Sequence, residues 1–128
     1  NSKEHRAVEL WGSGTPLREF LHVDDMAEAV VYAFENKLPE NLYNIGTGVD
    51  LTIKDLALLI QKTVGHTGEI IWDSSKPDGT PRKLMDVSKM TNAEWKAKIE
   101  LEDGIREIYE WYLINLQSNF LHFLSLSF

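Results

Sequence analysis

Two segments of the sequence contain residues suited to binding an anionic ligand with an aromatic part. In the first, Trp11 precedes the turn Gly12-Ser13-Gly14, and Arg18 follows it. An indole ring can stack on a nucleobase or a sugar, and a guanidinium group can donate two parallel hydrogen bonds to a diphosphate. The alternative is a tryptophan buried on a strand and an ordinary surface arginine. The Gly-x-Gly turn is not a dinucleotide-binding motif, because the third glycine of that motif is missing.

The second segment, residues 76–83, has the sequence Lys-Pro-Asp-Gly-Thr-Pro-Arg-Lys. Its three basic residues and one carboxylate give a local charge of +2 in a chain whose net charge is −7. This contrast suits an anionic ligand such as the diphosphate of a sugar nucleotide. Asp78 could accept hydrogen bonds from the ribose or the base of that ligand. The alternative is a solvated turn, the usual role of charged loop residues.

Other polar residues give weaker signals. His22 could act as a general acid, but we favour a structural role because it directly precedes a helix start. Asp24 is predicted to cap that helix, with Asp25 near its positive end, rather than to form a catalytic pair. The chain has no cysteine, which excludes disulfides and thiol catalysis, and its histidines lack metal-ligand spacing. A Tyr-x-x-x-Lys arrangement is also absent from the sequence.

The elements that position the two segments follow from apolar periodicity and turn signals. The pattern predicts strands at 7–11, 18–23, 42–45 and 69–72, and helices at 25–36, 53–64, 87–92 and 101–116. On the first helix, Met26, Val30 and Phe34 share one apolar face. Thr52 is predicted to cap the second helix, and Gly65 to end it. Short strands that alternate with helices predict a mixed α/β fold.

Composition limits the classes of function. The net charge of −7 disfavours nucleic acid binding, and the lack of an 18-residue apolar run predicts no membrane span. Without a signal peptide or cysteine, a cytoplasmic location is expected. Residues 1–117 are predicted to form one domain, or part of one. Residues 118–128 contain three Phe and three Leu and are predicted to be an apolar tail, either packed or a remnant of processing or cloning.

Four stretches resemble one family. Residues 10–27 (LWGSGTPLREFLHVDDMA), 43–48 (YNIGTG), 73–86 (DSSKPDGTPRKLMD) and 95–116 resemble the GDP-L-fucose synthases of the extended short-chain dehydrogenase/reductase superfamily. The run Arg-x-Phe-x-His-Val-Asp-Asp is shared by many extended members of the superfamily. The run Lys-Pro-Asp-Gly-Thr-Pro-Arg-Lys is much more specific, and it is the main reason to name the GDP-L-fucose synthases. The resemblance covers about residues 8–116, which is nearly the whole chain.

The resemblance implies a substrate and a set of binding residues. The family epimerises GDP-4-keto-6-deoxy-D-mannose at C3 and C5 and then reduces C4 with NADPH, giving GDP-L-fucose. Matching positions assign Trp11 and Arg18 to the GDP part of the substrate, with Arg18 on the diphosphate. Asp78 and Lys83 should complete that pocket. A homodimer is implied for the full-length enzyme.

The departures from the family imply a fragment. The family's Gly-rich cofactor loop, its Ser and Tyr-x-x-x-Lys group, and its epimerising Cys and His are missing from this sequence. The chain is therefore predicted to be a carboxy-terminal, substrate-binding part without the Rossmann half, inactive alone and without a bound cofactor. Two alternatives stay open. One is the substrate domain of another NAD(P)-dependent nucleotide-sugar epimerase or reductase, and the other is a non-catalytic interaction module.

Overall fold

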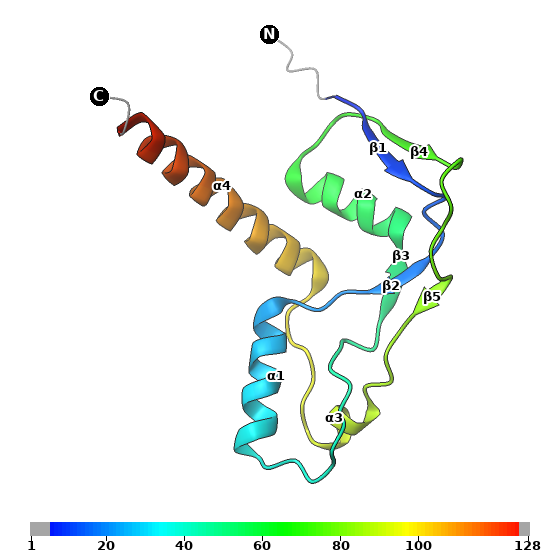
Figure 1. Cartoon of the computed structure of the whole chain (residues 1–128), viewed down its shortest axis with the longest axis vertical. Helices are drawn as coiled ribbons and strands as arrows, with labels where there is room; N and C mark the ends of the chain where they lie inside the picture. Colours follow the sequence, from blue (N-terminus) through cyan, green and yellow to red (C-terminus); the bar gives the residue numbers. More distant parts are fainter. Residues whose placement is uncertain (1–5, 126–128) are drawn as a thin grey trace.

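The computed structural model describes residues 6–125, with side chains described for residues 6–116 (Figure 1). Strands and helices alternate, as predicted for a mixed α/β fold. The elements are β1 (Val8–Trp11), β2 (Leu17–Glu19), α1 (Val23–Glu35), β3 (Asp50–Thr52), α2 (Ile53–Val64), β4 (Ile70–Asp73), β5 (Arg82–Lys83), α3 (Ser88–Asn92) and α4 (Leu101–Ser125).

The strands form two small sheets. In the first, β1 pairs in parallel with β4, and this pair lies beside α2 in Figure 1. In the second, β2 is central, antiparallel to β3 and parallel to β5. Because β1 and β2 are separated by the turn that follows Trp11, this turn joins the two sheets.

The ends of α2 confirm the prediction made from local signals. The Thr52 hydroxyl accepts a hydrogen bond from the backbone N–H of Asp55 at 3.0 Å and donates to its carboxylate at 2.6 Å. At the other end, Gly65 has a φ of +69°, the left-handed conformation that commonly ends helices. Both features depend on residues only a few positions apart in the chain, so they can be predicted without knowledge of the fold.

The predicted start of α1 is wrong by two residues. His22, not Asp24, is the N-cap, because its Nδ1 atom accepts a hydrogen bond from the backbone N–H of Asp24 at 3.2 Å. Asp25 is buried, at 2% exposure. Its Oδ2 atom accepts from the backbone N–H groups of Lys98 at 3.1 Å and Ile99 at 2.9 Å. Asp25 therefore connects the start of α1 to the segment that precedes α4.

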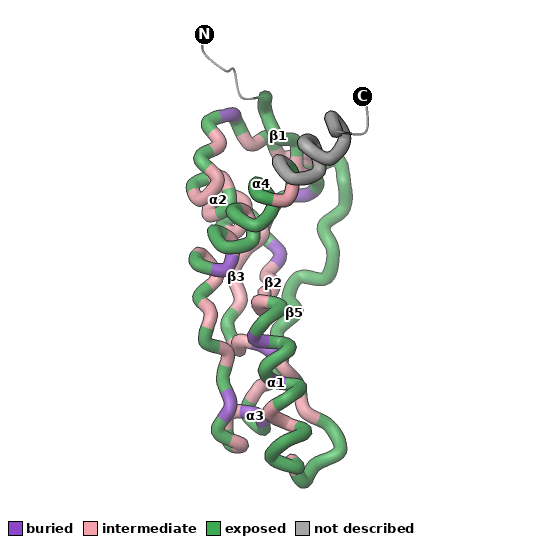
Figure 2. The backbone as a smooth tube through the Cα atoms, turned by 90° about the vertical axis from the view of Figure 1, so that its left-hand side faces the viewer, coloured by how far each residue is buried: buried purple, intermediate pink, exposed green. Residues whose placement is uncertain are grey.

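The core lies on a different face of α1 from the one predicted. Ala29 is fully buried against Met90 and Trp95, whereas the predicted apolar face is exposed, with Phe34 at 85%. Periodicity identifies an apolar face of a helix, but it does not say which element covers that face. Within residues 6–116, no side chains bury this face of α1, and Figure 2 shows how few segments are buried at all.

The strand predictions also need correction. The strand predicted at 18–23 is shorter in the structure, because β2 ends at Glu19 and α1 already begins at Val23. Residues 42–45 are not a strand in the part of the chain described, whereas β3 and β5 were not predicted. A strand needs a hydrogen-bonded neighbour, and no described segment forms a ladder with residues 42–45. In contrast, β3 and β5 are two short, polar segments that qualify as strands only because both pair with β2.

The last helix, α4, is longer than predicted and less covered. Its aromatic residues Trp111 and Tyr112 are exposed at 63% and 52%. The side chains of residues 118–128, expected to be a packed tail or a remnant, lie outside those that the structure describes. The chain has an accessible surface of 9916 Å², against about 6,900 Å² expected for a compact chain of its mass. In residues 6–125, no helix is long and apolar enough to cross a membrane.

Candidate functional site

The two predicted binding segments line one cavity. Its volume is about 140 Å³. The lining residues, which we call the cradle, are Trp11, Gly14, Pro16, Arg18, Ile53, Pro77, Asp78 and Gly79. Three of the four predicted site residues are thus brought together, although more than 60 positions separate the two segments. Lys83, the fourth, is not a lining residue, but it lies opposite Arg18 in the ladder between β2 and β5.

Asp78 holds the two sides of the cradle together. Its Oδ1 atom accepts a hydrogen bond from the backbone N–H of Ser13 at 2.8 Å, and its Oδ2 atom accepts from the Ser13 hydroxyl at 2.6 Å. The Ser13 hydroxyl and then the backbone N–H lower the pKa of Asp78, because both bonds favour the carboxylate. Each oxygen keeps a further lone pair, yet the arrangement is that of a clamp between the segments.

Gly12 is required by this clamp. Its φ is +86°, and a Cβ atom added there would lie 2.4 Å from Oδ1 of Asp78. A side chain at this position would therefore be strained and would also push Asp78 away from Ser13.

Replacing Gly12 with alanine is accordingly expected to release residues 76–81 from the turn. The Ser13 amide, which donates to Asp78, should then exchange at least about tenfold faster, because that hydrogen bond is lost. Gly65→Ala is the matched control, since Gly65 also has a positive φ of +69° but an added Cβ meets nothing within 4 Å. Equal exchange of the Ser13 amide in the two variants would show that the clamp does not depend on Gly12.

Trp11 is at the surface and not in the core. It is 73% exposed, which removes the alternative of a buried strand tryptophan. The Nζ atom of Lys76 lies 5.6 Å from the centroid of its ring, within the range of a cation–π contact. An exposed indole at the mouth of a cavity can stack on a planar group, and Lys76 brings a positive charge beside it.

Arg18 is half-buried and has hydrogen-bonding capacity left. Its Nη1 atom donates to the backbone oxygen of Leu17 at 2.6 Å. Among the described residues, no carboxylate forms a salt bridge with Arg18. A Cβ atom on Gly79 would come within 3.1 Å of its Nη2 atom, so Gly79 leaves room for the guanidinium. Because a guanidinium has five N–H donors, Arg18 can still bind an anion in the cradle.

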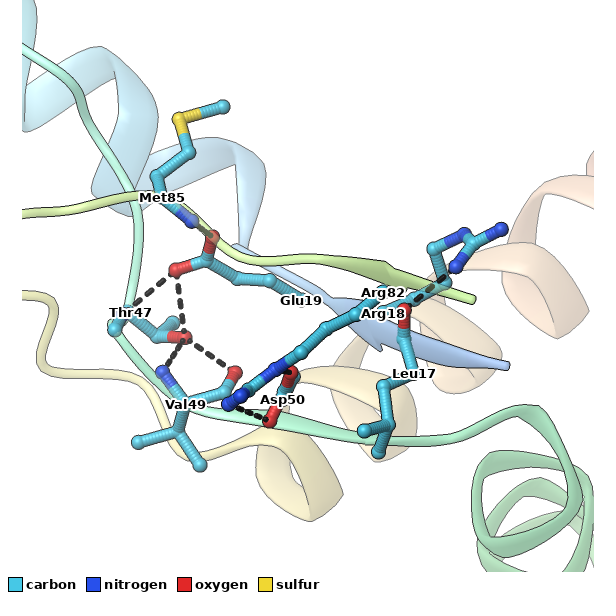
Figure 3. Close-up of polar contacts among 9 residues, drawn as sticks. Leu17, Arg18, Glu19, Thr47, Val49, Asp50, Arg82 and Met85 are labelled. Atoms are coloured by element: carbon cyan, nitrogen blue, oxygen red, sulfur yellow. Dashed lines mark hydrogen bonds and ion pairs between the residues drawn. The ribbon is translucent and has the colours of Figure 1, made fainter. Parts of the chain in front are cut away.

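Arg82, in contrast, has its charge already neutralised. Its Nε and Nη2 atoms donate to the two carboxylate oxygens of Asp50 at 2.6 and 3.3 Å (Figure 3). The hydrogen bond with Arg82 is the main reason that the pKa of Asp50 is lowered, and Asp50 in turn raises the pKa of Arg82. The predicted local charge of +2 therefore overstates what a ligand meets, because it counts Arg82 as available.

The sequence did not predict that Ser13 and Glu19 position the segments around the cradle. Oε1 of Glu19 accepts from the backbone N–H of Gly48 at 2.6 Å and from the Thr47 hydroxyl at 3.3 Å, and Oε2 accepts from the backbone N–H of Met85 at 3.1 Å. The one available signal was the Gly46-Thr47-Gly48 segment, since paired glycines are typical of close approach by another group. A Cβ atom on Gly46 would lie 2.4 Å from Oε1 of Glu19.

Two of the larger cavities do not offer comparable chemistry. These two, of about 570 and 400 Å³, lie along α2 and are lined mainly by aliphatic and aromatic residues. Neither presents an Arg or Lys from the described residues, so neither suits an anion. Among residues 6–116, whose side chains the structure describes, no group of three or more His, Cys, Asp or Glu residues could hold a metal ion.

Comparison with known proteins shows what the chain is similar to. The model of the NAD dependent epimerase/dehydratase family matches residues 1–46. The chain is 50% identical to GDP-L-fucose synthase 1 of Arabidopsis thaliana over 109 residues, which is 85% of this chain and 34% of the relative. It is also 50% identical to GDP-L-fucose synthase of Escherichia coli K12 over 117 residues, 84% of this chain and 36% of the relative.

One solved structure is similar over most of this chain. The GDP-mannoheptose C4 reductase of Campylobacter jejuni, with NADP bound, is 43% identical, with a TM-score of 0.72 over 84% of this chain and 35% of that chain. The chain thus spans about a third of the length of the relatives it matches. It is similar to one part of the GDP-L-fucose synthases that it matches.

Proposed function

We propose that this chain is the GDP-binding, carboxy-terminal part of an enzyme that converts GDP-4-keto-6-deoxy-D-mannose to GDP-L-fucose. The observation that carries the proposal is the meeting of Trp11, Arg18 and Asp78 at one small cavity, from two segments far apart in the chain. The names of the relatives at 50% identity support the substrate class.

The proposed roles follow from the geometry of each side chain. Trp11 stacks on the guanine or the ribose, because its ring is exposed beside the cavity. Arg18 donates to the diphosphate, with Lys83 as a second cation on the neighbouring strand. Asp78 keeps the two segments together through Ser13. These residues bind and orient the substrate but transfer no proton, so they contribute to catalysis by holding the sugar in place.

The residues present do not form a site for NADP. The Gly12-Ser13-Gly14 turn leads into strand β2 and not into a helix, and its Ser13 N–H is already bonded to Asp78. A dinucleotide site needs a glycine turn at a helix N-terminus that is open to the pyrophosphate. We therefore assign NADP and the proton-transfer groups of the full-length enzyme to the part outside this chain, and expect this chain alone to be inactive.

A panel of nucleotides tests the proposal. Isothermal titration calorimetry of the 128-residue chain should show that GDP binds more tightly than UDP or dTDP, since the narrow loop motif belongs to enzymes of GDP-sugars. Tighter binding of UDP or dTDP would instead indicate another nucleotide-sugar enzyme, and no binding of any nucleotide would contradict the site.

A related reductase is the second candidate function. The similarity to a GDP-mannoheptose C4 reductase, at 43% identity, favours it. Both candidates require GDP, and the cradle residues are assigned only to the nucleotide. GDP-L-fucose and a GDP-heptose are therefore expected to bind this chain with affinities within about threefold of each other, about 0.7 kcal/mol.

A further inference from the structure

We propose that Asp50 is a positioning residue for the cradle. Through its ion pair with Arg82, it holds β5 so that Lys83 lies beside Arg18 on the opposite face of the sheet, where both cations meet the diphosphate. This inference rests on the proposed function, and it assigns a role to two residues that do not line the cavity.

The register of the sheet separates the two faces. Arg18 lies opposite Lys83 on one side and Leu51 on the other, while Leu17 lies opposite Arg82 and Glu19 opposite Asp50. Side chains that are directly opposite in neighbouring strands point to the same face, and successive side chains alternate. Lys83 therefore shares a face with Arg18, and Arg82 shares the other face with Asp50. Figure 3 shows the Arg82 side chain extending toward Asp50 and away from Arg18.

Strand β5 has little else to hold it. It consists of two exposed residues, Arg82 and Lys83, and it pairs with β2 alone. Among the described residues, two side-chain contacts connect β5 and the segment just after it to the rest of the sheet: the Arg82 ion pair with Asp50, and the bond from the backbone N–H of Met85 to Glu19. The ion pair reaches past β2 to β3, so it links both outer strands of the sheet.

The ion pair is well placed to act as a fixed point. The Asp50 side chain is only 10% exposed, while that of Arg82 is 58% exposed. The two hydrogen bonds are of the forked kind that defines an orientation as well as a distance. A carboxylate anchored in β3 therefore controls the position of the more exposed arginine and of the strand that carries it.

The opposite face explains why such a fixed point is needed. Arg18 and Lys83 are like charges at directly opposite positions, an arrangement that destabilises strand pairing. Among the described residues, neither forms a salt bridge that would offset this repulsion. An anion bound between them removes the repulsion, so fixing the two cations together before binding favours the diphosphate.

Asp50→Asn tests the inference by separating phosphate binding from stacking. The variant is expected to bind GDP about tenfold more weakly, whereas its affinity for guanosine, which has no phosphate, should change less than about twofold. Asp50→Glu, which keeps the carboxylate, should restore most of the GDP affinity. In the double variant Asp50→Asn, Arg82→Gln, the loss should not exceed that of Asp50→Asn alone, because both changes break one contact.

The matched control is Glu40→Gln, which breaks the ion pair between Lys89 and Glu40 away from the cradle. It should leave the affinities for GDP and guanosine unchanged. An equal loss of both affinities in Asp50→Asn, or no loss of either, would overturn the inference.

Amide hydrogen exchange at residues 81–85 separates this inference from the proposed function. Faster exchange there in Asp50→Asn than in Glu40→Gln supports the positioning of β5. Failure of the unsubstituted chain to bind GDP would contradict the proposed function but not this positioning of β5. Unchanged exchange means that Asp50 does not hold β5.

Discussion

Arg18→Ala is expected to weaken GDP binding by at least about a hundredfold. A guanidinium that donates two charge-assisted hydrogen bonds to a diphosphate contributes about 3 kcal/mol or more, and alanine removes both bonds. The effect should be large because no described carboxylate competes for Arg18, whose only described bond is to the oxygen of Leu17. Titration calorimetry with GDP measures the loss directly.

Two further variants make the result specific to the fork of Arg18. Arg18→Lys retains the charge but not the paired donors, so its affinity for GDP should lie between those of the unsubstituted chain and Arg18→Ala. Arg106→Ala is the control, because Arg106 pairs with Glu102 and Asp103 on α4 and not with the cradle. Equal affinity for GDP in the unsubstituted chain and Arg18→Ala would show that Arg18 does not bind the diphosphate.

Asp25→Ala is expected to cause the largest loss of stability, about 3 kcal/mol or more in the free energy of unfolding. One buried oxygen of Asp25 accepts two backbone N–H groups, those of Lys98 and Ile99, and alanine leaves both without that acceptor. The loss also detaches α1 from the segment that leads into α4. Urea unfolding followed by tryptophan fluorescence measures it.

The neighbouring residue provides the control for Asp25. Asp24→Ala should change stability by less than about 0.5 kcal/mol, because its side chain is 69% exposed. Asp25→Asn should be milder than Asp25→Ala, since an amide oxygen can accept both N–H groups without the charge. A change below about 1 kcal/mol for Asp25→Ala would show that this contact is dispensable.

Features governed by neighbours in the chain were predictable. The Thr52 cap and the Gly65 end of α2 depend on contacts within a few residues, and both are confirmed. The segments around Trp11 and Asp78 were also recognisable, because aromatic, glycine and basic residues cluster there in the sequence.

Features that depend on residues distant in the sequence were not predictable. The face of α1 that is buried depends on Met90 and Trp95, and the unpredicted strands β3 and β5 exist through pairing with β2. Asp78 was predicted to contact the ligand. The sequence did not predict that Ser13, 65 positions away, donates hydrogen bonds to both of its carboxylate oxygens.

The amino-acid sequence by itself determined the residue types of the site, the class of ligand they suit and the local ends of the helices, because these depend on chemistry carried by short segments. Only the tertiary structure decided which charges are available. Arg82 and Lys83 are adjacent in the chain, yet strand alternation sends Arg82 to Asp50 and leaves Lys83 beside Arg18. That division depends on strand pairing between segments more than 30 residues apart, which no local pattern encodes.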